Sequence, residues 1–309
     1  MAGPPAEELL PAASRLRQWR RGSERAPHKP LLLLLALGRV QRQRPRLLTL
    51  GEIENDLRRL LEDFGPPRRR QQPHYPFWHL QSDGLWEVPE GARVAPVTGR
   101  GSPPLKDLRP LAGGLPGPLY EQLRADPDLV MRLARRLLDE HFPSSVHCDI
   151  LERVGLPDEG AAPAARDPGF RLRVLRAYEF RCAVCGYDGR LDATPVGLEA
   201  AHVQWWSHRG PDRVGNGLAL CTLHHKAFDL GVIGLDERLR VQVSQAFHGG
   251  QRARELVIAY AGAPLRRPQP GQPEVAERHR GWHEAQVFRG PGRVLVDAAA
   301  ESRDQPPYQ

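Results

Sequence analysis

The sequence predicts an α+β protein with two domains, and three observations support this fold class. The chain has 309 residues, enough for two domains of about 100–200 residues each. Hydrophobic residues make up 40% of it and charged residues 26%, as in folded globular proteins rather than disordered ones. Helical periodicity dominates the first half, whereas paired cysteine and histidine residues mark the second. We therefore expect a mainly helical N-terminal domain with one β-hairpin, linked to a second domain stapled by a metal ion.

The composition favours a protein without membrane spans and with a polyanionic partner. The longest apolar run, residues 31–37, is far shorter than the roughly 20 residues needed to cross a bilayer. Glu7 and Glu8 precede any apolar stretch, unlike in a signal peptide, so we expect a cytoplasmic location. The formal charge of +7 favours nucleic-acid binding through phosphate neutralisation. A solvated basic surface explains the charge equally well.

Two helices are expected within the first 37 residues. The first covers residues 7–21, where apolar side chains recur on one side. The second contains the leucine-rich run through Leu37 and must be a core element. A third helix begins after Thr49, because Thr49 and Glu52 have the spacing of a capping box.

The rest of the first half predicts a hairpin and two more helices. Residues 77–80 and 85–88 flank a turn-forming tetrapeptide, which predicts the β-hairpin. Asp126 is a good N-cap and is followed by proline at the first helical position, so a helix should run to about His141. A short helix is expected over residues 147–154.

Composition also suggests where the domains end. Residues 155–168 are rich in proline, alanine and glycine, as in an interdomain linker. We therefore expect domains at 1–154 and 169–263, followed by a C-terminal extension at 264–309. Trp282, Val287 and Phe288 are expected to dock within this extension.

Four residues in two pairs predict a zinc site: Cys182, Cys185, Cys221 and His224. Two such knuckles supply the four soft or borderline ligands that tetrahedral zinc prefers. The alternative is two unrelated cysteine pairs in a packed core. Structural zinc contributes about 10–16 kcal/mol in small domains, so we expect this domain to fold only around its metal. Cys148 stands apart and is expected to be a buried or idle thiol.

A second pattern lies among these ligands. His202 ends a predicted strand, Asn216 follows a glycine-containing loop, and His225 stands at the start of a helix. This order resembles the HNH, or ββα-metal, nuclease family over residues 170–243. A histidine that titrates near neutrality can take a proton from water, so His202 is the expected general base. The resemblance implies that Asn216 holds the His202 ring in register, and His225 is expected to bind Mg²⁺, Mn²⁺ or a similar divalent ion.

The sequence departs from the family at one position. Many HNH nucleases carry a metal ligand immediately before the catalytic histidine, where this chain has Ala201. Asp229, four residues after His225 on the same helical face, is a candidate replacement, and Glu199 is a weaker one. A solvent-facing role for Asp229 is an equal alternative. A zinc-dependent DNA-binding protein without catalysis also stays open.

The first half carries a separate resemblance. The segments around His28 and Lys29, around residues 74–80 and at Trp86 resemble the sulfur-binding domain of McrA-type restriction enzymes. Those domains recognise DNA in which sulfur replaces a nonbridging phosphate oxygen. Sulfur is larger and less strongly hydrated than oxygen, so a shallow pocket of ring edges and proline methylenes should accept it. The expected sulfur- and DNA-contacting residues are His28, Lys29, Tyr75, Pro76, His79, Trp86 and Arg100.

Together the two resemblances imply a type IV restriction endonuclease. Its expected partner is double-stranded DNA in phosphorothioate-modified form, and its expected reaction is phosphodiester hydrolysis nearby. One HNH site cuts one strand, so cutting both strands requires either a homodimer or two independent nicks. The alternative is an HNH endonuclease that acts on methylated or unmodified DNA.

Overall fold

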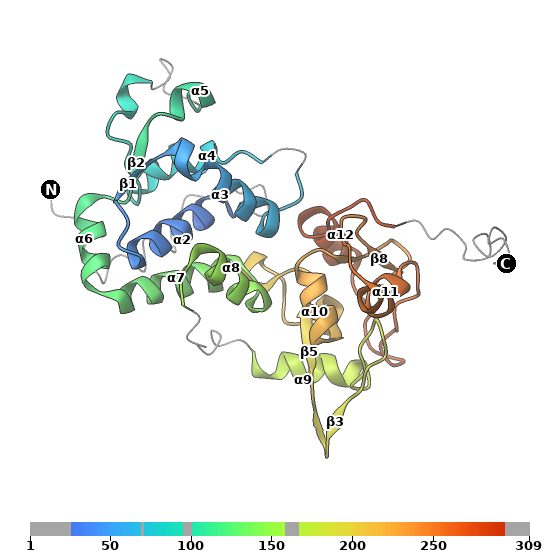
Figure 1. Ribbon diagram of the computed structural model, residues 1–309. Helices are drawn as coiled ribbons and strands as arrows, with labels where there is room; N and C mark the ends of the chain where they lie inside the picture. Colours follow the sequence, from blue (N-terminus) through green and yellow to red (C-terminus); the bar gives the residue numbers. More distant parts are fainter. Residues whose placement is uncertain (1–25, 69–70, 95–100, 158–166, 294–309) are drawn as a thin grey trace, which may run out of the picture. The chain divides into compact units, whose positions relative to one another are not determined.

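The computed structural model describes residues 26–68, 71–94, 101–157 and 167–293 (Figure 1). These residues form two compact units. The first lies within Met1–Arg166 and Trp205–Arg209, and the second within Asp167–Gln204 and Gly210–Gln309. None of the helices in the described ranges has both the length and the apolar character needed to cross a membrane. The mixed helical and small-sheet architecture confirms the predicted α+β class.

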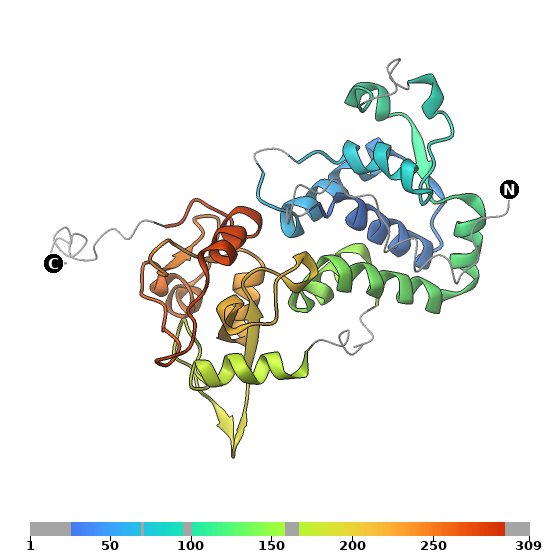
Figure 2. The same cartoon turned by 180° about the vertical axis from the view of Figure 1, so that it is seen from behind.

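The first unit is organised around one leucine-rich helix, α2 (His28–Gln41). Its side chains from Leu31 to Leu37 are all buried, so the helix must be covered on every side. Figure 2 shows other helices of the unit lying alongside it. The helices in contact with it are α3 (Leu50–Phe64), α4 (His74–His79), α6 (Gly117–Ala125), α7 (Pro127–His141) and α8 (His147–Val154).

The predicted helix starts in this unit are confirmed where the structure describes them. Thr49 and Glu52 form the capping box, in which the Thr49 N–H donates to the Glu52 carboxylate over 2.6 Å. Asp126 caps α7 by accepting the Leu129 N–H at 2.9 Å. The helix expected over residues 7–21 lies outside the described residues.

The β-hairpin predicted for residues 77–88 is wrong. This segment forms α4 and a 3₁₀ turn, η1 (Leu80–Asp83), which ends at Gly84 with φ of 72°. Phe77 and Leu80, three residues apart, are both fully buried, which a helix allows and the alternating faces of a strand do not. The antiparallel pair of this unit is formed instead by β1 (Leu47–Thr49) and β2 (Ala112–Gly114).

The second unit contains a strand pair followed directly by a helix. β5 (Leu198–His202) pairs antiparallel with β6 (Gly217–Cys221), so that His202 lies opposite Gly217. α10 (Thr222–Asp229) begins where β6 ends and packs against both strands, which gives the predicted ββα arrangement. α9 (Pro168–Ala177) also packs against both strands.

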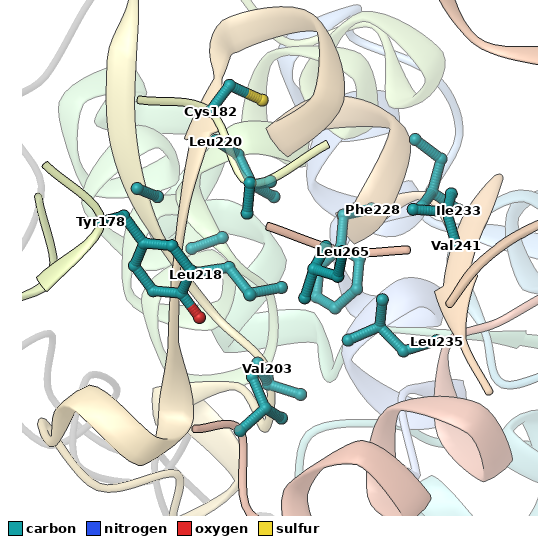
Figure 3. Packing of buried hydrophobic residues seen from close by; sticks show 14 of the residues in the cluster. Tyr178, Cys182, Val203, Leu218, Leu220, Phe228, Ile233, Leu235, Val241 and Leu265 are labelled. Atoms are coloured by element: carbon teal, nitrogen blue, oxygen red, sulfur yellow. The ribbon is translucent and has the colours of Figure 1, made fainter. Parts of the chain in front are cut away.

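Smaller elements complete the second unit. Their bounds are β3 (Arg190–Leu191), β4 (Thr194–Pro195), β7 (Ile233–Leu235), β8 (Val241–Val243), α11 (Gln251–Leu256) and α12 (Glu277–Gln286). The core runs between the strands and α10, and Figure 3 shows Leu218 and Leu220 of β6 within it. β3 pairs with β4, and β7 with β8.

Packing in this unit continues beyond residue 263. Leu265 and Val275 belong to the same buried cluster as the strands, and Figure 3 shows Leu265 close to Phe228. Trp282, Val287 and Phe288 are buried, as expected from their apolar character. The segment after residue 263 therefore contributes to the core of the second unit.

Candidate functional site

The two predicted ligand pairs come together in the second unit. The candidate ligand atoms of Cys182, Cys185, Cys221 and His224 all lie within 4.8 Å of one another. His224 Nδ1 is 3.2 Å from the Cys221 sulfur and 3.6 Å from the Cys182 sulfur. Three thiols and one imidazole at this spacing can hold a metal ion, and the donor set suits zinc.

Local structure explains how each ligand is placed. The first pair occupies a tight turn that ends at Gly186, whose φ of 77° favours glycine. Cys221 is the last residue of β6, and His224 lies in the first turn of α10. The Nε2 atom of His224 contacts the Leu256 carbonyl at 2.9 Å, which fixes the ring with Nδ1 toward the thiols.

The electrostatics of the cluster also suit a cation. Hydrogen bonds from the thiols of Cys185 and Cys221 lower the pKa of Cys182. A thiolate is the form of cysteine that binds metals, so Cys182 favours the charge state that a metal ion requires.

His202, the candidate general base, ends β5 and is largely buried. Its Nε2 atom lies 2.7 Å from Oδ1 of Asp212. Phe170 of α9 stacks on the imidazole, with ring centroids 4.1 Å apart and an angle of 21° between the planes. Asp212 was missed by the sequence reasoning, since nothing in its spacing distinguishes it from other loop carboxylates.

Asn216 is fully buried and pins the loop that follows His202. Its Oδ1 atom accepts the Gln204 N–H at 2.8 Å, and its Nδ2 donates to the carbonyls of Gln204 and Pro211 at 3.0 and 3.1 Å. A Cβ at Gly210 would lie 1.7 Å from the Gln204 carbonyl oxygen, so this closed loop requires glycine. Asn216 thus tethers the loop to the strand end that carries His202.

His225 lies between two carboxylates. Its Nδ1 contacts Glu199 of β5, and its Nε2 is 3.1 Å from Oδ2 of Asp229. Burial alone would lower the pKa of His225, but the carboxylates of Asp229 and Glu199 raise it to about 9. These imidazole and carboxylate donors fit Mg²⁺ or Mn²⁺ better than a soft metal.

The two carboxylates differ in exposure. Asp229 is 4% exposed, so the solvent-facing alternative for this residue is wrong. Glu199 has a side chain that is 46% exposed. Ala201, at the position where the family often has a metal ligand, is buried in the core. Glu199 and Asp229 therefore provide the negative charge around His225.

The expected sulfur-contacting residues lie in the first unit, and several are close together. Tyr75 and His79 are one turn apart on α4, and their ring centroids are 4.4 Å apart. Burial lowers the pKa of His79, and the charges of Lys29 and His74 lower it further. Lys29 itself forms an ion pair with the buried carboxylate of Asp83.

The other predicted contact residues differ in accessibility. Tyr75 is 48% exposed, whereas Pro76 is buried and His28, at the start of α2, is partly buried. Arg100 lies outside the described residues. These positions leave Tyr75 as the most exposed aromatic side chain of the group.

Trp86 does not line an open pocket, which corrects the prediction made for it. It is 3% exposed and packs edge-on against Phe77, with ring centroids 5.7 Å apart. A Cβ at Gly113 would lie 2.7 Å from its indole nitrogen. Trp86 is therefore a core residue of the first unit.

Two segments of the chain match known protein families. Residues 6–159 match the ScoMcrA-like DNA sulfur-binding domain, and residues 182–236 match the HNH endonuclease family. No curated protein matches the chain as a whole or in part.

Similar solved structures cover the first half. The sulfur-binding domain of ScoMcrA in complex with phosphorothioated DNA is 29% identical, covers 48% of this chain and 94% of that one, and has a TM-score of 0.41. The sulfur-binding domain of SprMcrA with phosphorothioated DNA is 26% identical, with coverages of 50% and 96% and a TM-score of 0.42. The type IV phosphorothioation-dependent restriction endonuclease ScoMcrA is 26% identical with a TM-score of 0.40 over 48% of this chain. The match spans only 27% of that enzyme's length.

Proposed function

We propose that this chain, which matches the ScoMcrA-like DNA sulfur-binding domain over residues 6–159 and the HNH endonuclease family over residues 182–236, is a type IV restriction endonuclease. It binds phosphorothioate-modified DNA and hydrolyses phosphodiester bonds nearby. The observation that carries the proposal is the presence, in one chain, of a sulfur-binding family match and a ββα unit with His202, Asn216 and His225 on its strand, loop and helix.

Recognition of the modified phosphate is assigned to the first unit. Tyr75, Pro76 and His79 form the apolar wall, and His28 and Lys29 contribute positive character. A weakly hydrated sulfur loses less than oxygen when it contacts ring edges and methylenes, which favours the modified phosphate. Arg100 stays part of the proposal as a residue that reaches the bases or phosphates. Lys29 already forms an ion pair with Asp83, which neutralises part of its charge. We therefore propose that its contact with DNA is of moderate strength.

Hydrolysis is assigned to the second unit. His202 takes a proton from the attacking water, and Asn216 keeps the loop after His202 closed. His225, with Asp229 and Glu199, would hold a divalent ion such as Mg²⁺ or Mn²⁺. When bound, this ion stabilises negative charge on the phosphate and on the leaving oxygen. The carboxylates of Asp229 and Glu199 support this role, because a cation bound at His225 would meet their negative charge in place of the ring proton.

The zinc proposal concerns folding rather than catalysis. Cys182, Cys185, Cys221 and His224 would hold Zn²⁺ and join the turn after α9 to the junction of β6 and α10. Both β6 and α10 are parts of the ββα arrangement, so the metal would fix the element that carries His225.

The remaining expectations belong to the same proposal. The recognition domain covers residues 1–154, a linker covers 155–168, and the nuclease domain begins at 169, with 263 as its predicted end before the extension at 264–309. A cytoplasmic location and a homodimer that cuts both strands are further parts of it.

The decisive experiment compares cleavage of phosphorothioate-modified and unmodified plasmids by the full-length protein in Mg²⁺ or Mn²⁺. We expect cleavage of the modified plasmid only. His202→Ala should abolish cleavage but keep zinc content and DNA affinity. Equal cleavage of both plasmids would support the endonuclease without sulfur specificity, and binding without cleavage in either metal would support the non-catalytic alternative.

A further inference from the structure

We propose that Asp212 is a positioning residue of the nuclease centre, which holds the imidazole of His202 in the tautomer and orientation needed for general-base catalysis. This inference rests on the proposed nuclease function and adds a residue to its mechanism. The observation behind it is the 2.7 Å contact between Asp212 Oδ1 and His202 Nε2.

The contact determines which nitrogen of His202 is basic. An ionised carboxylate only accepts hydrogen bonds, so Nε2 must be the donor in this pair. The single proton of the neutral imidazole is then on Nε2, and the basic lone pair is on Nδ1. Without Asp212 the proton could move to either nitrogen, and part of the protein would hold the wrong tautomer.

Asp212 is held in place from outside the pair. Arg173 of α9 donates to the Asp212 carbonyl oxygen at 3.0 Å, and the same guanidinium group is 2.6 Å from Asp167. Asn216 donates to the carbonyl of the preceding residue, Pro211, at 3.1 Å. The carboxylate therefore meets His202 from a backbone that is fixed on both sides, which limits the cost of orienting it during the reaction.

Phe170 restricts the other degree of freedom of the ring. Its side chain is buried and stacked on the imidazole with 4.1 Å between centroids. Stacking fixes the plane of His202, and the Asp212 contact fixes its rotation within that plane. The two contacts come from different elements, α9 and the loop, and together define the ring position.

The chemical step balances with these residues. A water oxygen forms a bond to phosphorus while one of its protons moves to Nδ1 of His202. The bond from phosphorus to the leaving oxygen breaks, its electron pair stays on that oxygen, and the oxygen takes a proton from solvent. His202 is then an imidazolium cation with Nε2–H still directed at Asp212, whose negative charge stabilises it. It loses the extra proton to solvent before the next cycle.

The test uses full-length protein, modified plasmid and three substitutions: Asp212→Asn, Asp212→Ala and Asp212→Glu. The matched control is Asp192→Asn, which makes the same change from carboxylate to carboxamide at an exposed turn residue with φ of 51°. Single-turnover cleavage, DNA affinity, zinc content and melting temperature are measured for each. We expect Asp212→Asn to lower the cleavage rate about 10²-fold, with affinity and zinc unchanged, and Asp212→Glu to recover part of the rate.

A pH profile separates positioning from a purely structural role. The carboxylate favours the protonated imidazole, so its loss should move the acidic limb of the rate profile to lower pH. α9 brings the charged side chains of Arg171 and Arg173 to β5 and its following loop, and Arg173 also pairs with Asp167. Acetate supplies a carboxylate and should restore part of the cleavage rate of Asp212→Ala. This rescue tests the proposal independently of the Asp212→Asn and Asp212→Glu variants.

Two results would overturn the proposal. One is an Asp212→Asn rate within twofold of the control with an unchanged pH profile. The other is a rate loss that Asp212→Glu and acetate do not relieve and that parallels a fall in melting temperature. If the unsubstituted protein fails to cleave modified DNA, the proposed nuclease function fails before this question arises.

Discussion

His279 contacts Gln204 through a 2.7 Å hydrogen bond between its Nδ1 and the Gln204 Oε1. Arg278 donates to the other ring nitrogen at 3.1 Å, so His279 is neutral with its proton on Nδ1. Burial, and to a smaller extent the charge of Arg278, lower the pKa of His279, which agrees with this state. Because Asn216 holds the backbone of Gln204, helix α12 is joined to the loop after His202.

This link predicts that residues beyond 263 stabilise the nuclease unit. Phe288 is buried, and its ring packs so closely on Gly234 that a Cβ at Gly234 would lie 2.6 Å from the Phe288 Cδ2 atom. Phe288→Ala should lower the free energy of unfolding by about 3–5 kcal/mol, because it leaves a cavity in a packed core. Leu191→Ala is the control, since this side chain is 70% exposed and its loss should change stability by less than about 0.5 kcal/mol. Urea unfolding of zinc-loaded protein measures both, and equal values would refute a core role for Phe288.

Removal of the metal from the cysteine cluster should unfold the second unit and spare the first. Cys182 is fully buried, and its sulfur contributes one of four converging ligands. Cys182→Ser, or chelation of the metal, should abolish ordered structure after residue 167. The reason is that binding of a structural zinc ion contributes about as much free energy as the whole free energy of unfolding of a domain. Cys148→Ser is the control, since Cys148 is exposed and lies outside the cluster. Its exposure also shows that Cys148 is not a buried thiol.

NMR spectra distinguish the outcomes for the cysteine variants. Signals of residues 26–157 should persist in Cys182→Ser, whereas those of the second unit should collapse to unfolded positions. A fully dispersed spectrum from a zinc-free variant would contradict the prediction.

Local signals in the sequence located much of the fold and supplied most residues of the proposed site. Thr49 and Asp126 cap their helices by contacts with residues three positions away, so short-range spacing was enough to predict them. The ligand quartet was also evident, because each pair has the spacing of a zinc knuckle. His202, Asn216 and His225 were proposed from their order along the chain.

Features that depend on distant contacts could not be predicted. Trp86 is a core residue because Phe77 and Gly113 pack against it, and Gly113 lies 27 positions further along the chain. His279 meets Gln204 over an even longer separation. The turn signal at residues 81–84 was correct as a turn, but it ends helical structure instead of joining strands. Apolar runs this short fit either the helical or the strand periodicity.

An ion-pair network predicts acid sensitivity of the first unit. Glu54 accepts from Arg109 Nε at 2.8 Å and from Arg58 at 2.8 Å, and its hydrogen bond with Arg109 lowers its pKa, as does its contact with Arg58. Because the folded pKa is below the unfolded value, the stabilisation is present above the unfolded pKa and is lost as pH falls through the folded one. The half-exposed arginines limit it to about 1 kcal/mol.

The measurement for Glu54 is thermal unfolding as a function of pH. Glu54→Gln should lower the melting temperature at pH 7, and the difference from the unsubstituted protein should vanish in acid. Glu121→Gln, whose carboxylate is 60% exposed, should show no such pH-dependent difference. A pH-independent deficit in Glu54→Gln would show that packing rather than charge is responsible.

Tyr75 and Trp86 should respond oppositely to substitution. Tyr75 is 48% exposed beside His79, so Tyr75→Ala should leave stability intact and weaken binding of phosphorothioate DNA up to about tenfold, the scale of a sulfur–aromatic contact. Trp86→Ala should destabilise the unit by about 3–5 kcal/mol, because it empties core volume. Fluorescence anisotropy with modified and unmodified duplexes, beside thermal unfolding, measures both effects. Equal loss of affinity for the two duplexes in Tyr75→Ala would exclude a sulfur-specific role.

Charge around His225 should determine binding of a divalent ion. Glu199 contacts Nδ1 of His225 and is 46% exposed, so Glu199→Gln removes a ligand charge at an accessible position with little effect on packing. Asp229 is nearly inaccessible and 3.1 Å from Nε2, so Asp229→Asn removes the partner that orients the ring. Both should weaken Mn²⁺ binding by about 10–100-fold, the usual effect of losing a ligand's partner.

Electron paramagnetic resonance of zinc-loaded protein counts free Mn²⁺ directly, without reliance on cleavage. Glu237→Gln, an exposed change elsewhere in the unit, serves as the control. Mn²⁺ affinities equal to the control in both variants would exclude His225 as the ion-binding centre, whereas a loss in Asp229→Asn alone would identify the buried carboxylate as the essential one.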